Sequence, residues 1–279
     1  MTRADTAPLH RLLRSELSCL LSRPRTLVLL GVLALLPVAI GIGVASAGAP
    51  SGTLGDPGPG LIAAVTANGL MLPIVSLAVA LTLLLPLAVC VAAADALAGE
   101  ASSGTLRMLL LAPVGRLRLV AVKALGVLAL AIIGVLLIAA VGWLAGTLVV
   151  GDEGRLLTLS GSAIDAGDVW GRVWLAVGWT VLQLAAVGAI ALAVSALTDR
   201  PLVVIATVLG GAIVFGVLLA IPSLGWLHPL LLTSAWPSLA DLLRDPIPTE
   251  NLTHGAFVAV YYLVLGLAVA VTGTLRREV

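Results

Sequence analysis

Long runs of apolar residues, separated by shorter polar stretches, make up most of the chain. A helix needs about 20 residues, at about 1.5 Å each, to cross the roughly 30 Å hydrocarbon core of a bilayer. Six runs reach that length, and they cover residues 27–47, 70–94, 119–150, 172–197, 202–222 and 255–275. The pattern predicts an all-α polytopic membrane protein whose six transmembrane helices form a single domain over residues 1–279.

Composition strengthens this prediction. Of the 279 residues, 60% are hydrophobic and 10% are charged, and the mean hydropathy is +1.17. Soluble globular chains are roughly 45–50% apolar and about 25% charged. No predicted span carries an acid or a base near its middle. A soluble fold is therefore excluded, and the net charge of +1 gives no reason to expect a nucleic-acid partner.

The basic residues predict which side of the membrane each loop occupies. With six spans, three of the 15 Lys and Arg residues fall on one side, namely Arg155, Arg172 and Arg244. All the others fall on the opposite side, before the first span, between the second and third, after the fourth and after the sixth. Short loops rich in Lys and Arg stay in the cytoplasm. We therefore expect both termini to be cytoplasmic, with the chain in the cell's inner (plasma) membrane.

Aromatic residues gather at the predicted outer ends of the spans, and they allow two interpretations. They could form an aromatic belt that anchors the outer interface, or some rings could line an exit for an amphiphilic or cationic substrate. On the second interpretation, Trp179 and Tyr261 are candidates for a substrate path. Gln183, near the middle of its span, predicts either an interhelical hydrogen bond or a contact to substrate. The sequence leaves both pairs of alternatives open.

Two shorter elements are predicted outside the spans. In residues 1–26, leucines recur at helical spacing between Leu9 and Leu21, and Pro24 closes the pattern. This favours an amphipathic helix in the inner membrane interface. In the last outer loop, Leu239, Leu242 and Leu243 could form the apolar side of a short surface helix.

The sequence lacks the residue patterns of a zinc site, an ion-coupled transporter and a phosphate-binding loop. The three histidines are scattered, without the spacing of a zinc site. The spans lack the ionisable side chains of an ion-coupled transporter. A phosphate-binding loop needs a lysine after glycines, whereas the single lysine, Lys123, stands in Val-Ala-Val-Lys-Ala. We expect no catalytic, metal or cofactor residue in this chain, so any ATP that drives it must bind to another polypeptide.

A charged segment, residues 95–118, interrupts the apolar pattern between the second and third spans. Glu100 opens it, and Ser102 or Ser103 can cap a short helix that Pro113 would end. Such a helix is a plausible docking element for a soluble partner. The alternative is a basic interfacial hairpin held by lipid headgroups.

This segment resembles the first cytoplasmic loop of type-2 ABC transporter permeases. The shared pattern is Glu-x-x-x-Gly-Thr-Leu, Leu-Leu, Pro-Val-x-Arg and Lys. The amphipathic N-terminal helix, the six spans, "SALTDRPLVVIA" after the fourth span and the closing "VTGTLRREV" are also similar to that family. The resemblance implies that the segment is a coupling helix docking on an ATP-binding subunit. The implied contact residues are Glu100, Ser103, Gly104, Thr105, Leu106, Leu109, Leu110, Pro113 and Arg116.

The resemblance also implies a mechanism. Two ATP-binding subunits, which hold ATP and Mg, would drive two permease subunits, identical or related, through alternating access among the membrane lipids. Most relatives export, so we expect outward transport, and Gly210 and Gly211 would permit close helix contact where the permeases meet or within one subunit. The alternative is a membrane scaffold or assembly factor that recruits a cytoplasmic protein without transport. Lipid, drug and peptide substrates all remain compatible with the sequence.

Overall fold

The computed structural model of the protein describes residues 22–47, 69–102, 116–150 and 165–276. This part of the chain is helical and contains no strand. Six of its helices are long and apolar enough to cross a membrane. The protein is thus an all-α, multi-pass membrane protein. The amphipathic helix predicted in residues 1–26 and the core of the coupling helix, residues 103–115, lie outside the described residues.

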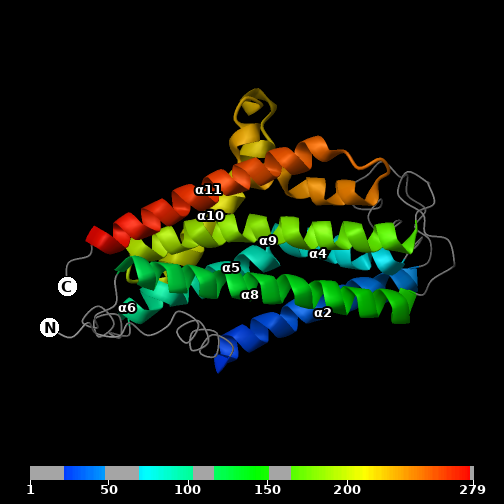
Figure 1. Ribbon diagram of the computed structural model, residues 1–279, viewed down its shortest axis with the longest axis horizontal. Coiled ribbons are helices and arrows are strands. Elements are labelled where there is room, and N and C mark those ends of the chain that lie inside the picture. Colours follow the sequence, from blue (N-terminus) through cyan, green and yellow to red (C-terminus); the bar gives the residue numbers. More distant parts are fainter. Residues whose placement is uncertain (1–21, 48–68, 103–115, 151–164, 277–279) are drawn as a thin grey trace.

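The described helices follow the apolar runs, with small differences at their ends. The long ones are α2 (Pro24–Ala47), α8 (Arg116–Ala145), α9 (Ala166–Leu197), α10 (Pro201–Leu219) and α11 (Thr249–Arg276). Short turns extend two of the runs, namely η1 (Gly69–Met71) before α4 and η3 (Gly146–Val150) after α8. In Figure 1, α6, the first turns of α8 and the last turns of α11 lie at one end of the molecule, which we call the α6 end.

The second apolar run forms two helices instead of one continuous span. They are α4 (Leu72–Thr82) and α5 (Leu84–Ala94), and the chain departs from helical geometry at Leu83, where φ is −149° and ψ is −48°. Pro86 gives the physical reason, because its nitrogen cannot bond the carbonyl of Thr82 and its ring crowds that carbonyl. After α5, a π-helical turn, η2 (Asp95–Gly99), leads into α6 (Glu100–Ser102).

The bundle is built around α9. This helix packs along α11 on one side and against α8 and α5 on the other, while α2 packs against α8 (Figure 1). The seam between α9 and α11 is tight, because a Cβ on Gly266 would lie 2.7 Å from the backbone carbon of Ala189. Small residues allow such close approach of helices in membranes. By contrast, Val204 is the one buried residue of α10, so α10 stands at the edge of the bundle.

Between α10 and α11 the chain makes three short helices, η4 (Pro222–Leu224), η5 (His228–Leu230) and η6 (Leu232–Leu243). Leu239, Leu242 and Leu243 share one apolar side of η6, as the sequence predicts. All three side chains are buried, at most 1% exposed, because η6 turns back into the bundle against α4 and α11. Their apolar side covers neighbouring helices and contributes to the core.

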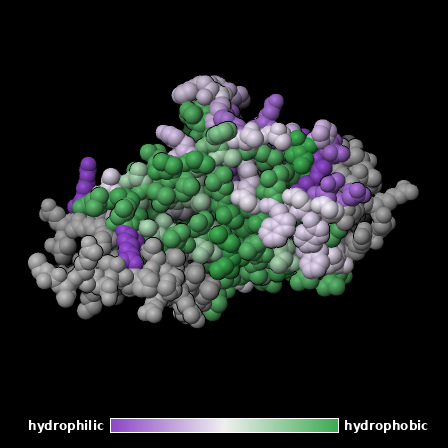
Figure 2. All heavy atoms as spheres, viewed as in Figure 1, coloured by the Kyte–Doolittle hydropathy of each residue, from purple (hydrophilic) through white to green (hydrophobic). Residues whose placement is uncertain are grey.

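Much of the outer surface is apolar. Figure 2 shows hydrophobic residues over the middle of the face in view, while the hydrophilic ones lie mostly toward the two ends and around the protruding η4–η5 segment. This distribution suits a bundle that stands in lipid, since the polar groups then reach the two membrane interfaces.

Candidate functional site

At the α6 end, a buried ion pair joins the two segments that flank the predicted coupling helix. The Nζ of Lys123, on α8, donates to the Oε1 of Glu100, the first residue of α6. The side chains of Lys123 and Glu100 are only 5% and 15% exposed. A buried charge is tolerated when it is paired. The pair therefore joins α6 to the second turn of α8, the two elements on either side of residues 103–115.

The π-helical turn before α6 is fixed to the central helix. The Oγ of Ser195, on α9, accepts the backbone N–H of Ala98 at 2.9 Å and lies 3.5 Å from the carbonyl oxygen of Ala94. A second ion pair, between Arg23 and Asp95 at 3.3 Å, links the start of α2 to the same turn. These contacts would thus transmit a movement of α6 to α8, α9 and α2.

Two of the predicted coupling residues fall at the edges of the described chain. Glu100 begins α6, and Arg116 begins α8. The remaining ones lie outside the described residues, namely Ser103, Gly104, Thr105, Leu106, Leu109, Leu110 and Pro113. Their contact with an ATP-binding subunit stays a prediction.

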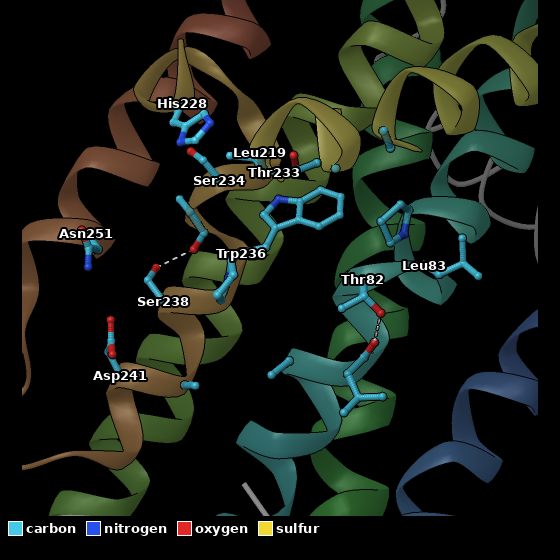
Figure 3. Close-up of a pocket in the computed structure, with 18 of the residues that line it drawn as sticks. Thr82, Leu83, Leu219, His228, Thr233, Ser234, Trp236, Ser238, Asp241 and Asn251 are labelled. Atoms are coloured by element: carbon cyan, nitrogen blue, oxygen red, sulfur yellow. Dashed lines mark hydrogen bonds between the residues drawn. The ribbon is translucent and has the colours of Figure 1, made fainter. Parts of the chain in front are cut away.

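A large cavity, which we call the chamber, lies among α4, α5, α10, α11, η5 and η6. Its volume is about 910 Å³, near the upper end of the roughly 300–1,000 Å³ of ligand pockets. Figure 3 shows labelled side chains around it, from Thr82 and Leu83 at the α4–α5 break to Ser238 and Asp241 on η6. The broken helix helps to open this space. The polar residues that line the chamber are Thr82, His228, Thr233, Ser234, Ser238, Asp241, Arg244, Asn251 and His254.

The chamber carries both signs of charge. Asp241 and Arg244 form an ion pair at 3.6 Å, in which the carboxylate of Asp241 is the more buried side chain. Within the described ranges, no three His, Cys, Asp or Glu side chains are grouped so that they could hold a metal ion.

Arg172 holds η6 in place. This arginine is buried on α9, and its guanidinium donates to the carbonyl oxygens of Leu242 at 2.9 Å and Arg244 at 2.5 Å. It also lies 3.3 Å from the carboxylate of Asp245. Carbonyls at a helix C-terminus need such donors. Sequence analysis assigned Arg172 only to the outer side, and no sequence motif signals its role.

The wall formed by η5 is held by side chains of α11. A ring nitrogen of His254 lies 2.8 Å from the carbonyl oxygen of Pro229, and the hydroxyl of Tyr262 donates to the carbonyl of Leu230 at 3.1 Å. The ring of His228 in turn reaches the carbonyl of Leu218 at the end of α10, at 3.2 Å. These bonds tie the end of α10 to α11 across the chamber.

The three residues proposed from sequence as a substrate path do not line the chamber. Trp179 donates its indole N–H to the carbonyl of Leu252 at 3.0 Å, and Gln183 donates to that of Gly255 at 3.0 Å. Both side chains are buried between α9 and α11, so the interhelical hydrogen bond predicted for Gln183 is confirmed. Tyr261 is 65% exposed on α11. The structure brings Trp179 and Gln183 together and leaves Tyr261 apart.

The tryptophans divide into two groups. Trp174 and Trp226 are largely exposed, and the Trp143 and Trp170 rings contact each other with centroids 5.8 Å apart. Exposed rings of this kind fit an aromatic belt. Trp236 differs, because it is buried and lines the chamber.

Comparison with known proteins gives one family match. The family model described as "ABC-2 family transporter protein" matches residues 23–255, which is most of the chain. It spans α2 to the first turns of α11 and includes the Glu100–Lys123 pair and the chamber. A search of curated proteins finds no match.

Proposed function

Because the chain belongs to the ABC-2 family of transporter proteins and is a membrane permease component of an ABC transporter, we propose that it forms the translocation path of an ATP-driven exporter. The proposed assembly contains two copies of an ATP-binding subunit, which hold ATP and Mg, and a second permease subunit, identical or related. The α6 end and both termini face the cytoplasm of the cell's inner membrane.

The observation that carries this proposal is the large chamber bounded by α4, α5, α10, α11, η5 and η6, whose mainly apolar wall also holds charged and polar side chains, within a chain of this family. Its charged residues, Asp241 and Arg244, belong to the segment between α10 and α11, which the sequence predicts on the outer side. The chamber lies between the broken α4–α5 pair and the exposed α10. A shift of α5 relative to α10 would therefore change its shape.

The movement driven by ATP binding would reach this chain at the α6 end. ATP-driven closure of the two ATP-binding subunits moves the coupling helices, and the Glu100–Lys123 pair transmits this movement to α5 and α8. Because α5 also lines the chamber at Pro86, one mechanical path runs from the coupling loop to the cavity. This chain needs no catalytic residue for such a mechanism.

A second permease would cover α10. Within the described chain, a Cβ placed on Gly210 meets nothing within 4 Å. Glycines left open in this way allow another helix to approach closely. This exposure supports a subunit contact at α10 in preference to tight packing within one subunit.

The experiment is co-purification of the full chain with a candidate ABC ATP-binding subunit, followed by measurement of ATP hydrolysis in lipid vesicles. We expect Glu100→Ala and Gly104→Trp to release the ATP-binding subunit or to uncouple its hydrolysis from transport. Matched controls are Glu250→Ala and Gly167→Trp, at exposed positions at the opposite end of the bundle. Unchanged assembly and transport in the first two variants would refute the docking assignment. Stable assembly without any transport would favour a scaffold.

A further inference from the structure

We propose that the chamber and a neighbouring apolar groove together form one binding site for a single-tailed zwitterionic amphiphile of the lysophospholipid class. Its acyl tail lies in the groove, its head lies in the chamber, and oxygen atoms near the junction accept hydrogen bonds from Trp236 and Thr233. This assignment rests on the proposed function only where it identifies the amphiphile as cargo.

The groove has a volume of about 320 Å³ and is lined by α9, α10, α11 and the start of η6. No Asp, Glu, Lys, Arg or His contributes to its lining, and aliphatic residues such as Val187, Ile190 and Leu265 dominate. Its size is at the lower end of the roughly 300–1,000 Å³ of ligand pockets. An apolar groove of this kind suits a hydrocarbon chain better than it suits water.

The groove and the chamber share a wall. Five residues line both cavities, namely Pro86, Leu209, Ala212, Thr233 and Trp236. The polar and charged chamber therefore continues directly into the apolar groove. A ligand that fills both must itself be polar at one end and apolar at the other.

Two polar atoms in this shared wall lack partners. Among the described residues, nothing accepts a hydrogen bond from the Nε1 of Trp236 or bonds the Oγ1 of Thr233, although both atoms are buried. Trp236 is only 8% exposed, and Figure 3 shows its indole within the chamber view beside Thr233. Buried polar groups are almost always hydrogen-bonded. The N–H and the hydroxyl are thus suited to ester, hydroxyl or phosphate oxygens at the junction of a lipid head and tail.

The groove is also placed for access from the membrane. Helix α10 packs against α5, α9 and η6 and hardly touches α11. The rings of Phe215 on α10 and Tyr262 on α11 both line the groove, with centroids 6.5 Å apart. These rings contact each other, so a tail would enter the groove beside them. The head would meet the Asp241–Arg244 pair, whose two charges match a zwitterion.

The test is equilibrium binding of a lysophosphatidylcholine to the full chain, purified without the ATP-binding subunit in maltoside detergent and followed by native mass spectrometry. We expect one saturable site. Gly211→Leu should weaken binding at least about tenfold by filling a ligand-sized groove, because Gly211 lines the groove and has open space at its Cβ. Gly210→Leu is the matched control, since Gly210 has the same open space but does not line the groove.

Trp236→Phe tests the hydrogen bond separately, because it keeps an aromatic ring and removes the N–H. We expect about three- to tenfold weaker binding of lysophosphatidylcholine and unchanged binding of dodecyltrimethylammonium, which has a tail but no acceptor. Absence of a saturable site, wild-type affinity in both Trp236→Phe and Gly211→Leu, or equal losses in Gly210→Leu and Gly211→Leu would overturn the proposal. Such a failure leaves the proposed function intact if the ATP-binding subunit still co-purifies and its hydrolysis is coupled.

Discussion

Lys123 and Glu100, 23 residues apart in the chain, form a buried ion pair that joins α8 to α6 across the base of the predicted coupling loop. Lys123 is the only lysine of the sequence, and Glu100 is the first residue of the Glu-x-x-x-Gly-Thr-Leu pattern. Their contact means that a force on the coupling loop acts on α5 and α8 together.

Removal of one partner of this pair should be costly. Lys123→Met leaves a buried carboxylate without its cation, and we expect a loss of about 3–5 kcal/mol in the free energy of unfolding. The double variant Glu100→Gln with Lys123→Met should recover most of that loss, because neither charge then remains. Thermal unfolding of the full chain in detergent measures both effects.

The Arg23–Asp95 pair is the control for this prediction. Arg23 is 34% exposed, so solvent weakens the attraction. Arg23→Gln should cost less than about 1 kcal/mol. Similar losses for Arg23→Gln and Lys123→Met would contradict the special role of the buried pair.

Arg172 should be essential for docking of η6. Arg172→Met leaves the carbonyls of Leu242 and Arg244 without their donor, with an expected loss of about 3 kcal/mol. Arg172→Lys should rescue little, because an ammonium lacks the forked geometry of a guanidinium. Thermal unfolding and faster trypsin cleavage after Arg244 would report the undocking of η6. Arg200→Met, at an exposed turn, should change stability by no more than about 0.5 kcal/mol, and an equal effect of the two substitutions would refute the prediction.

The α9–α11 seam should not tolerate a methyl group at Gly266. A Cβ there would lie 2.7 Å and 2.8 Å from backbone atoms of Ala189 and Ile190. We expect Gly266→Ala to lower stability by about 1–3 kcal/mol through overpacking. Gly178→Ala, on an open face of α9, should instead raise stability by up to about 1 kcal/mol through helix propensity. Calorimetric or fluorescence melting curves compare the two, and a stabilised Gly266→Ala would show that the seam is looser than described.

Ser195 should stabilise the π-helical turn. Ser195→Ala removes the acceptor of the buried Ala98 N–H, with an expected cost of about 1–3 kcal/mol. If the turn then reverts to α-helical bonding, Glu100 rotates away from Lys123 and coupling of ATP hydrolysis falls. Ser46→Ala removes an exposed hydroxyl that bonds a backbone carbonyl of its own helix, α2, and serves as the control. Unfolding curves and ATP hydrolysis in vesicles measure the two readouts, and a coupled, fully stable Ser195→Ala protein would count against the role of this bond.

Local sequence patterns were sufficient to predict the fold class and the family of this protein. Apolar runs of membrane-spanning length predicted the six helices, because hydrocarbon thickness and helical rise fix the length that is needed. The Glu100 motif indicated the family because its residue types recur at fixed spacing. Both signals depend on residues near one another in the chain.

The sequence predicted the break between α4 and α5 only in part. Pro86 is a signal for it, but Pro37 lies inside the continuous helix α2, so a proline alone does not predict where a helix breaks. The neighbours of each proline decide whether the freed carbonyl and the bend are accommodated.

The chamber, the groove and the buried η6 depend on contacts between distant segments. Nothing near Arg172 in sequence indicates that it bonds carbonyls some 70 residues away, and the spacing of Leu239, Leu242 and Leu243 predicts an apolar face without saying what covers it. A periodic pattern predicts which side of a helix is apolar. The element that packs against this side depends on the arrangement of the other helices. Helix packing therefore placed Trp236 in the wall of the chamber and Trp179 in an interhelical hydrogen bond, although the sequence pattern predicts one outer interface for the aromatic residues.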